Sequence, residues 1–322
     1  MPGFTTHYLF GQQTYQSIRD SGLKKAIQKN HTAFSLGLQG PDIFFYDILA
    51  AVLPKKNPGS VAHTADTREF LRHLLDSPRI FQTEQEKQIA SVYILGFIGH
   101  YLLDSTCHPY IYAMTHYNRQ PQGYIGRHIR LETDIDTTLL WHYQNRKPSE
   151  FHQCESISLS KTQKTVVSSL LYYAFSRTYP GLGITRHRIL QAIYGMWAGT
   201  RLLYDPTGRK KAVVRRIESV VCGYAMLSPM FPSDTLIFHK DPCNLKHVPW
   251  KNPWDHSRKS TESFFDLFEK AQQTYGSLLN DINDFFLHER TPKEQEKATR
   301  LLLYRLGNLC YHSGLTSAPY LV

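Results

Sequence analysis

Several features that would assign a chain to a secreted, membrane-spanning or disordered class are missing from this sequence. No stretch of about 18 apolar residues is present, so we expect no transmembrane helix. The N-terminus, MPGFTTHYLFGQQ, has neither the basic segment nor the continuous apolar run of a secretory signal. Hydrophobic residues make up 41% of the chain, enough for a sizeable core, and no block is depleted of aromatics. We therefore expect a folded, cytoplasmic protein.

Cysteine is scarce as well, and its few positions are scattered. The 322 residues contain five cysteines, and no two of them form a CxxC pair. An odd number of widely spaced thiols is not a disulfide framework, and it offers no thiolate metal site. The pattern is typical of a reducing compartment. The five are Cys107, Cys154, Cys222, Cys243 and Cys310.

Acidic residues are outnumbered by basic ones, 27 against 37, which gives a formal net charge of +10. This charge favours an anionic partner such as a phosphate ester, a lipid headgroup or nucleic acid. Basic residues are densest in GRKKAVVRR, residues 208–216. A solvated helix face is the simpler interpretation of this segment, and peripheral contact with an anionic membrane is the alternative.

The hydrophobic periodicity is helical almost everywhere, whereas strand signals are few. It predicts an all-α protein, a multi-helix bundle that forms a single helical domain over 1–322. Thr83 and Glu86 form a capping box that opens a long helix, and Thr291 followed by Pro292 opens another that runs to about residue 310. Further helices are expected near 8–28, 63–76, 125–145, 161–178, 185–203 and 264–286.

The longest irregular stretch covers residues 228–253 and is rich in Pro, Lys and aromatic residues. Loops of this length in compact proteins are often lids or binding loops. No linker in the chain forces a domain boundary.

The strongest chemical pattern is GHYLLDSTCHPY, which places His100, Asp104 and His108 at successive intervals of four residues. Residues four apart on a helix share a face. The surrounding positions are apolar nearly all round, so this helix should be buried, and a buried carboxylate is costly unless it is paired or bound to a metal. A hydrogen-bonded His–Asp pair in the core explains this triplet alone equally well.

The residues around this pattern add two expectations. Pro109 disfavours helical geometry at the preceding residue, so we expect the helix to end at His108. Gly96 and Gly99 remove side-chain bulk beside His100, which leaves room for another helix or an ion.

A second pattern, GRHIRLETDID, places His128 and Glu132 one turn apart on a following helix, the spacing of two ligands on one metal. Exposed pairs with this spacing are also common in ordinary helices. Asp134 and Asp136 follow, either as partners of a ligand or as solvated side chains.

Three single residues complete the candidate set. His7 and His63 lie at expected helix starts, and Asp42 follows the turn-forming Gly40. Taken singly, each histidine is more often structural, and Asp42 alone is best explained as a helix cap. Taken jointly, seven or eight nitrogen and oxygen ligands without a thiolate suit several adjacent zinc ions.

In their order along the chain, the motifs THYLFG, GPDIFF, AHTAD, GHYLLDSTCHPY and HIRLE resemble the bacterial zinc-dependent phospholipase C family, which belongs with the single-strand-specific zinc nucleases. The resemblance covers roughly residues 1–146, and it implies that this part is the metal-binding core. Residues 147–322 share only helical character with the family and are expected to form an additional helical region.

The resemblance implies two or three zinc ions. The first would be held by Asp42, His63, His100 and Asp104, the second by His108, His128 and Glu132, and the third by His7, Asp104 and the terminal amine. The spacing from Asp104 to His108 is shorter than in the secreted members. His7 also lies closer to an ordinary initiator Met than the first histidine of those members lies to their N-terminus.

The implied reaction is phosphodiester hydrolysis, with Asp42 as the general base that orients a water molecule. The nominal substrate is a phospholipid, which yields diacylglycerol and a phosphorylated headgroup. Glu132 matches the phospholipase branch better than the nuclease branch, so nucleic acid is the less favoured substrate. The alternatives are a zinc-dependent nuclease or other phosphodiesterase, and a non-catalytic zinc-binding helical protein that associates with a membrane or a partner.

Overall fold

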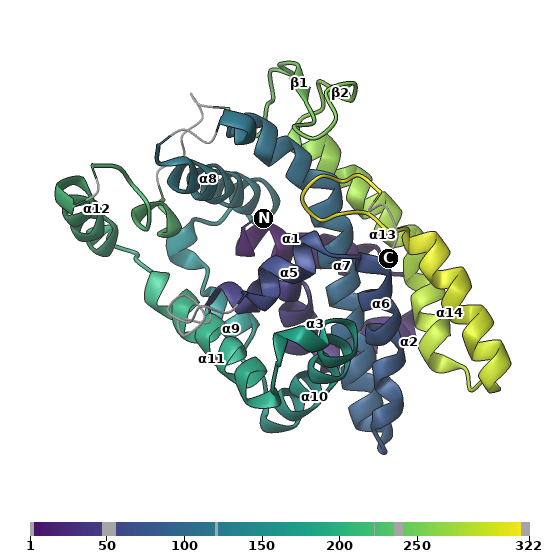
Figure 1. Ribbon diagram of the computed structural model, residues 1–322. Coiled ribbons are helices and arrows are strands. Elements are labelled where there is room, and N and C mark those ends of the chain that lie inside the picture. Colours follow the sequence, from purple (N-terminus) through teal and green to yellow (C-terminus); the bar gives the residue numbers. More distant parts are fainter. Residues whose placement is uncertain (1–2, 47–55, 120–121, 222, 235–240, 317–322) are drawn as a thin grey trace.

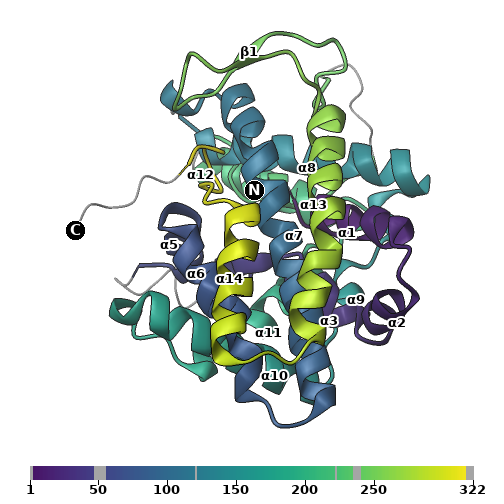
Figure 2. The same cartoon turned by 90° about the vertical axis from the view of Figure 1, so that its right-hand side faces the viewer.

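The computed structural model describes residues 3–46, 56–119, 122–221, 223–234 and 241–316. Helices make up nearly all of the regular structure in these ranges, so the all-α prediction is confirmed (Figures 1 and 2). Strands in the same ranges form one short antiparallel hairpin of β1 (Trp250–Lys251) and β2 (Lys259–Ser260). None of the described helices combines the length and hydropathy needed to cross a bilayer.

The long central helix α7 (Glu84–Met114) is the axis of the fold. Its predicted capping box is present, because Thr83 and Glu86 bond each other's backbone N–H. Its middle is buried on all sides by helices from both halves of the chain. These are α1 (Phe4–Ser17), α3 (His31–Gly37), α10 (Lys161–Thr178) and α13 (Phe264–Leu287).

The prediction that this helix ends at His108 is wrong, because α7 continues through Pro109 to Met114. A proline inside a helix removes one backbone hydrogen bond and costs about 3 kcal/mol. Tyr110 and Ile111, in the turn that follows, are fully buried in the core. Their burial offsets that cost, so tertiary packing outweighs the local signal.

Capping residues divide two of the predicted helices. The helix expected over 8–28 is α1 and α2 (Ser21–Lys29), because the Asp20 side chain accepts from Leu23 N–H and starts a new helix. The helix expected over 63–76 is α5 (Pro58–Thr64) and α6 (Thr67–Asp76), capped by Asn57 and Asp66. Each cap satisfies backbone N–H groups that a continuous helix would have bonded internally.

The remaining predicted helices occur close to their expected positions. They are α8 (Tyr124–Gln144), α11 (Arg186–Leu203) and α14 (Pro292–Leu306), the last ending where Gly307 takes a positive φ of 77°. The shorter elements are α9 (Gln153–Ser156), α12 (Arg209–Val221), η1 (Gly40–Tyr46), η2 (Ser77–Ile80), η3 (Tyr117–Arg119), η4 (Pro148–Glu150), η5 (Pro180–Leu182) and η6 (Ser228–Met230). Of the predicted irregular stretch 228–253, residues 235–240 lie outside the described ranges.

One hydrophobic cluster runs through the described part of the chain. It includes Phe10 and Phe97 from the first half and Leu170, Phe268 and Tyr311 from the second. The predicted metal-binding core 1–146 therefore packs against the additional helical region. The four described cysteines are free, in agreement with the absence of a disulfide framework, and Cys222 lies outside the described ranges.

Helices α3 and α7 cross at a contact between two glycines. A Cβ on Gly37 would lie 2.2 Å from the Tyr93 carbonyl oxygen, and a Cβ on Gly96 would lie 2.3 Å from the Phe34 carbonyl oxygen. The room that Gly96 was expected to leave is therefore filled by a helix. The close approach places Leu38, just after α3, beside His100.

We expect Gly96→Ala to destabilise the fold by about 1–3 kcal/mol, since the added methyl group meets backbone atoms that cannot rotate away. Gly276→Ala on α13 is the matched control, because a Cβ there meets no atom within 4 Å. Thermal unfolding of both variants measures the difference. Equal midpoints for the two variants would show that the glycine contact is not tight.

Candidate metal centre

The side chain of Asp104 lies in the middle of α7 and is 0% exposed. Four imidazole nitrogens surround its carboxylate: His7 Nε2 at 3.2 Å, His63 Nε2 at 3.4 Å, His100 Nε2 at 3.2 Å and His108 Nδ1 at 3.7 Å. All four histidines are themselves fully buried. A carboxylate in such a place is stable only next to positive charge or a metal ion.

The ligand candidates around Asp104 come from four elements, α1, η1, α5 and α7. α7 supplies His100, Asp104 and His108, and the first turn of α1 supplies His7, as expected. The expectation that His63 begins a helix is wrong, because His63 lies in the last turn of α5. The cause is the Asn57 side chain, which accepts from Gly59 and Ser60 N–H and starts the helix earlier.

The remaining carboxylate, Asp42, is placed by a backbone turn at Gly40. Gly40 has a φ of +51°, and a Cβ there would lie 2.4 Å from the His100 ring. Glycine alone meets both conditions, so the chain can pass directly over this imidazole. The turn leads into η1, where Asp42 Oδ1 lies 3.2 Å from His63 Nε2 and 3.8 Å from His100 Nε2.

Backbone carbonyls orient three of the imidazoles. Their Nδ1–H groups donate to the oxygens of Gly59, Leu38 and Tyr311, at 2.7, 3.1 and 2.7 Å for His63, His100 and His108 respectively. A carbonyl can only accept, so each bond fixes one proton on Nδ1, and in the neutral ring Nε2 keeps its lone pair. Metal-binding histidines are commonly held in this way.

The resulting centre contains polar atoms without partners. Eight buried nitrogen and oxygen atoms of these residues make no hydrogen bond: His7 Nδ1 and Nε2, Asp42 Oδ1, His63 Nε2, His100 Nε2, both Asp104 oxygens and His108 Nε2. Buried polar groups are rarely left in this state. Imidazoles and carboxylates without thiolates are a ligand set that suits zinc, so the residues present fit the metal.

The described part of the chain contains two groups of three residues whose donor atoms, within each group, lie within 4.8 Å of one another. One is formed by His7, Asp42 and His100, and the other by His63, His100 and Asp104. The two groups share His100, so the residues predicted to hold the first and third ions lie around one space. The predicted terminal-amine ligand falls on residues 1–2, which lie outside the described ranges.

The predicted second site is arranged differently. His128 and Glu132 lie on one face of α8, with His128 Nε2 2.9 Å from Glu132 Oε1. The Tyr112 ring contacts both His128 and His108. Its centroid lies 4.9 Å from that of His128 and 5.6 Å from that of His108. Among the residues that the structure describes, these two and His108 do not form a group of close donor atoms. Their joint role as ligands therefore stays a prediction.

Protonation inside the centre is uneven. Burial alone would lower the pKa of His63, but the carboxylates of Asp104 and Asp42 outweigh it and raise that pKa to about 9. Burial lowers the pKa of His108 well below its ordinary value. Burial would raise the pKa of the Asp104 carboxyl, yet the neighbouring His100 and His108 hold it well below its usual range. The metal-free centre therefore carries a proton on His63 at neutral pH.

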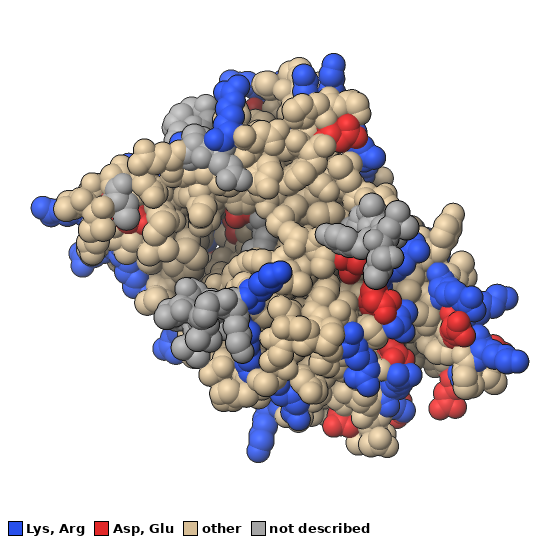
Figure 3. All heavy atoms as spheres, in the orientation of Figure 1, with Lys and Arg blue, Asp and Glu red and all other residues tan. Residues whose placement is uncertain are grey.

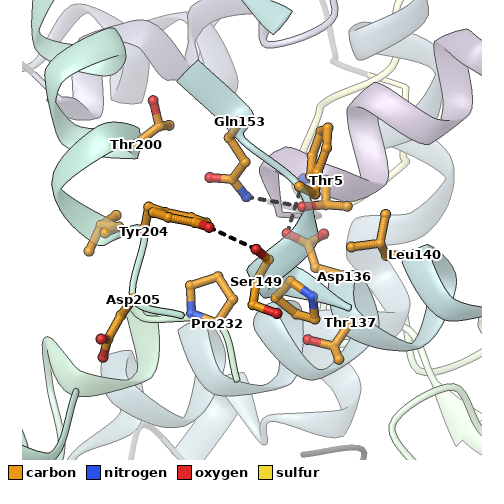
Figure 4. Close-up of a pocket in the computed structure, with 13 residues that line it drawn as sticks. Thr5, Asp136, Thr137, Leu140, Ser149, Gln153, Thr200, Tyr204, Asp205 and Pro232 are labelled. Carbon is orange, nitrogen blue, oxygen red and sulfur yellow. Dashed lines mark hydrogen bonds between the residues drawn. The ribbon is translucent and has the colours of Figure 1, made fainter. Parts of the chain in front are cut away.

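Asp136 pins the segment that carries His7. Its carboxylate accepts from the Thr5 and Thr6 N–H groups, at 3.1 and 2.8 Å, and from the Thr6 hydroxyl at 2.6 Å. Figure 4 shows Asp136 beside Thr5, which also accepts a bond from Gln153. Asp136 is thus a buried anchor for the start of α1 rather than a solvated side chain. The small cavity that these residues line, about 20 Å³, has room for one water molecule.

Two residues beside the centre carry no signal in the sequence. Tyr311 supplies the carbonyl that holds His108, and the ring of His312 lies 5.5 Å from that of His63 and 5.6 Å from that of His108. Burial lowers the pKa of His312 to about 3, so this ring is neutral. Both residues lie in the loop after α14, far along the chain from the motifs they contact.

A cleft of about 520 Å³ opens beside the metal centre. Its wall includes the polar residues Asp42, His128, Glu132 and His312 together with the apolar residues Phe4, Phe45, Ile125, Ile129, Met196 and Met230. The face in Figure 3 is hollowed near its middle, and acidic atoms are visible inside the hollow. Of the residues around Asp104, Asp42 lines the cleft, and much of the remaining wall is apolar.

The fold and the site thus define an all-helical protein with a buried imidazole–carboxylate cluster beside a cleft. A family model described as zinc dependent phospholipase C matches residues 6–178, just over half of the chain. The chain belongs to this zinc-dependent phospholipase C family. No curated protein and no solved structure matches it.

Because zinc and a proton compete for His63 Nε2, we expect zinc binding at neutral pH to release about one proton from this residue. Calorimetric titration in buffers of different ionisation enthalpy counts the protons. Zinc affinity should rise with pH up to about pH 9, where His63 loses its proton without the metal. A proton count that is the same in His63→Gln as in the wild type would contradict this assignment.

The stability of the metal-free protein should depend on the protonation of His63. The pKa of His63 is raised on folding, so its contribution is fully present below the unfolded value of 6.5 and is lost as the pH rises through about 9. At 1.36 kcal/mol per pKa unit the loss is about 3 kcal/mol. Chemical unfolding across this range measures it. The exposed control His288→Gln should keep the same profile as the wild type.

Proposed function

We propose that the protein is a zinc-dependent phosphodiester hydrolase of the phospholipase C type, which converts a phospholipid into diacylglycerol and a phosphorylated headgroup. The observation that carries this proposal is the convergence of Asp42, Asp104 and four buried histidines beside a cleft with apolar walls. A phospholipid has the matching chemistry, with an anionic phosphodiester beside long apolar chains. Zinc would supply Lewis acidity to the phosphate and a water molecule that ionises near neutral pH.

The two carboxylates differ in their access to the cleft. Asp104 is surrounded by the four histidines and does not line the cleft, which suits a residue that only holds metal. Asp42 contacts the same cluster but also lines the cleft. Asp42 is therefore the candidate general base, since its carboxylate can reach a water molecule next to a substrate. His63, His100 and His7 would hold the metal together with Asp104.

The cleft walls favour lipid over nucleic acid. Phe4, Phe45, Ile125, Ile129 and Met196 present mainly aliphatic and aromatic surface. Burial of apolar surface contributes about 25 cal/mol per Å², so acyl or glycerol carbons gain from these walls. A nucleotide backbone would bring further phosphates, and the cleft wall includes Glu132 and Asp136, which would repel them.

We expect Asp104→Asn to lose bound zinc and hydrolytic activity together, because it removes the charge around which the four histidines gather. Zinc per chain is measured by elemental analysis and activity with a soluble phosphocholine ester. Asp284→Asn, an exposed carboxylate on α13, is the matched control and should keep both. A zinc-free Asp104→Asn variant that still hydrolyses the ester would show that the reaction does not need the metal.

We expect Asp42→Asn to behave differently, with a rate loss of about 10²-fold or more and only a small loss of zinc. Asparagine keeps a ligand oxygen but cannot take a proton. Zinc content and turnover are measured on the same sample. Equal losses of zinc and of rate would make Asp42 a ligand only.

The substrate class is tested with the wild-type protein. Chelator-sensitive cleavage of a phosphocholine ester, without cleavage of single-stranded DNA, supports the phospholipase. The reverse preference would identify a zinc nuclease instead. Stoichiometric zinc with no hydrolysis of either substrate would identify a non-catalytic zinc protein, and less than about one zinc per chain would contradict both hydrolase functions.

A further inference from the structure

Helix α12 (Arg209–Val221) projects at the edge of the molecule, away from the central helix (Figure 1). Polar side chains attach its inner face to the body. Lys211 Nζ donates to the Phe231 carbonyl at 2.8 Å, and the Glu218 carboxylate accepts from the N–H groups of Met226 and Ser228 at 3.0 and 3.1 Å. This anchoring fixes which face of the helix looks outward.

The outward face is apolar, which reverses the usual polarity of a surface helix. Val213, Ile217, Val220 and Val221 occupy positions i, i+4, i+7 and i+8, so they share one face. Their exposed fractions are 59%, 58%, 83% and 75%. None of them belongs to the hydrophobic cluster of the described residues. Aliphatic side chains exposed to this extent in a row favour a surface that covers them.

Positive charge borders this apolar face. Arg209, Lys210 and Arg216 are exposed on α12. The single acidic residue of the helix, Glu218, is turned inward and is 6% exposed. Lys210 Nζ donates to the carbonyls of Leu202 and Tyr204, whereas Arg209 and Arg216 form no ion pair with an acidic residue in the described part of the chain. The outward side therefore combines exposed aliphatic side chains with positive charge. A helix of this kind binds the interface of an anionic bilayer, where the aliphatic face enters the headgroup region and the cations meet phosphates.

The helix lies beside the cleft. A neighbouring pocket is lined by Lys211 and Arg215 of α12 together with Thr133 of α8. Thr133 also lines the cleft at the candidate metal centre. So do Met230 and Pro232, which follow the segment whose N–H groups bond Glu218. A surface bound by α12 would therefore lie close to the opening of the cleft.

We propose that α12 is an interfacial helix that docks the protein on an anionic phospholipid surface through Val213, Ile217, Val220 and Val221. This function is binding, so it goes beyond the proposed hydrolysis and does not depend on it. Lipid is favoured over nucleic acid as the occupant because a phosphate backbone offers nothing to four exposed aliphatic side chains. Lipid is favoured over a second copy of this chain because the charged residues that border the face are all positive.

The experiment is cosedimentation of the full-length protein with vesicles of phosphatidylcholine, alone or mixed with phosphatidylserine. The lipid is assayed afterwards, so hydrolysis is counted separately from binding. The first variant combines Val213→Ser, Ile217→Ser and Val220→Ser, and the second combines Arg209→Gln with Arg216→Gln. The matched control, Leu301→Ser with Tyr304→Ser, removes comparable exposed apolar surface from α14. Circular dichroism checks that each variant is folded.

The wild type should bind the mixed vesicles more tightly than phosphatidylcholine alone, and added salt should weaken this binding. The serine variant should weaken binding at least about tenfold, since three aliphatic groups that would enter the bilayer are lost. The glutamine variant should weaken it by a similar factor through the loss of two charges. The α14 control should bind like the wild type.

Four results would overturn the proposal. The first is a serine variant that binds mixed vesicles like the wild type, and the second is an α14 control that loses as much binding as the serine variant. The third is a self-association without lipid that the serine variant abolishes, which would assign the face to a second copy. The fourth is tight binding of a single-stranded oligonucleotide that needs the arginines but not the valines. A wild type that binds vesicles without hydrolysing them would refute the proposed hydrolysis and leave the docking intact.

Discussion

The structure depends on one electrostatic constraint, the carboxylate of Asp104 inside an otherwise apolar helix. An anion there costs several kcal/mol unless positive charge or a metal surrounds it. Four imidazoles from α1, α5 and α7 surround this carboxylate, and that of His63 carries a proton at neutral pH. Gly37 and Gly96 let α3 lie directly against α7, and Gly40 lets the turn before η1 pass over the His100 ring. The packing of the core and the arrangement of the centre therefore depend on the same contacts.

The parts of this arrangement that could be predicted are encoded locally. The capping box at Thr83 and the helical spacing of His100 and Asp104 are properties of a few neighbouring residues, and both are found in the structure. The position of His63 was missed because a cap at Asn57 outweighs the apolar pattern. The continuation through Pro109 was missed because the burial of the next turn, which offsets the local cost, is visible only in three dimensions.

The parts that could not be predicted depend on contacts between distant segments. Asp136 follows a candidate ligand pair by only a few residues, yet its role as an anchor becomes clear only when α8 packs against α1. His312 and Tyr311 carry no motif at all. The segment 208–216 shows a related difficulty, because an amphipathic pattern reveals two faces but not which one turns outward. The buried contacts of Lys211 and Glu218 decide that question.

The carbonyl of Tyr311 that holds His108 has a consequence for the order of events during biosynthesis. The two residues are 203 positions apart, so the ribosome must add all of the intervening chain before the imidazole is fixed. At about 5–20 residues per second this takes on the order of ten to forty seconds. Until then the nascent chain carries histidines and carboxylates that are not yet arranged. The imidazole of His108 therefore takes its final orientation only after Tyr311 has been synthesised.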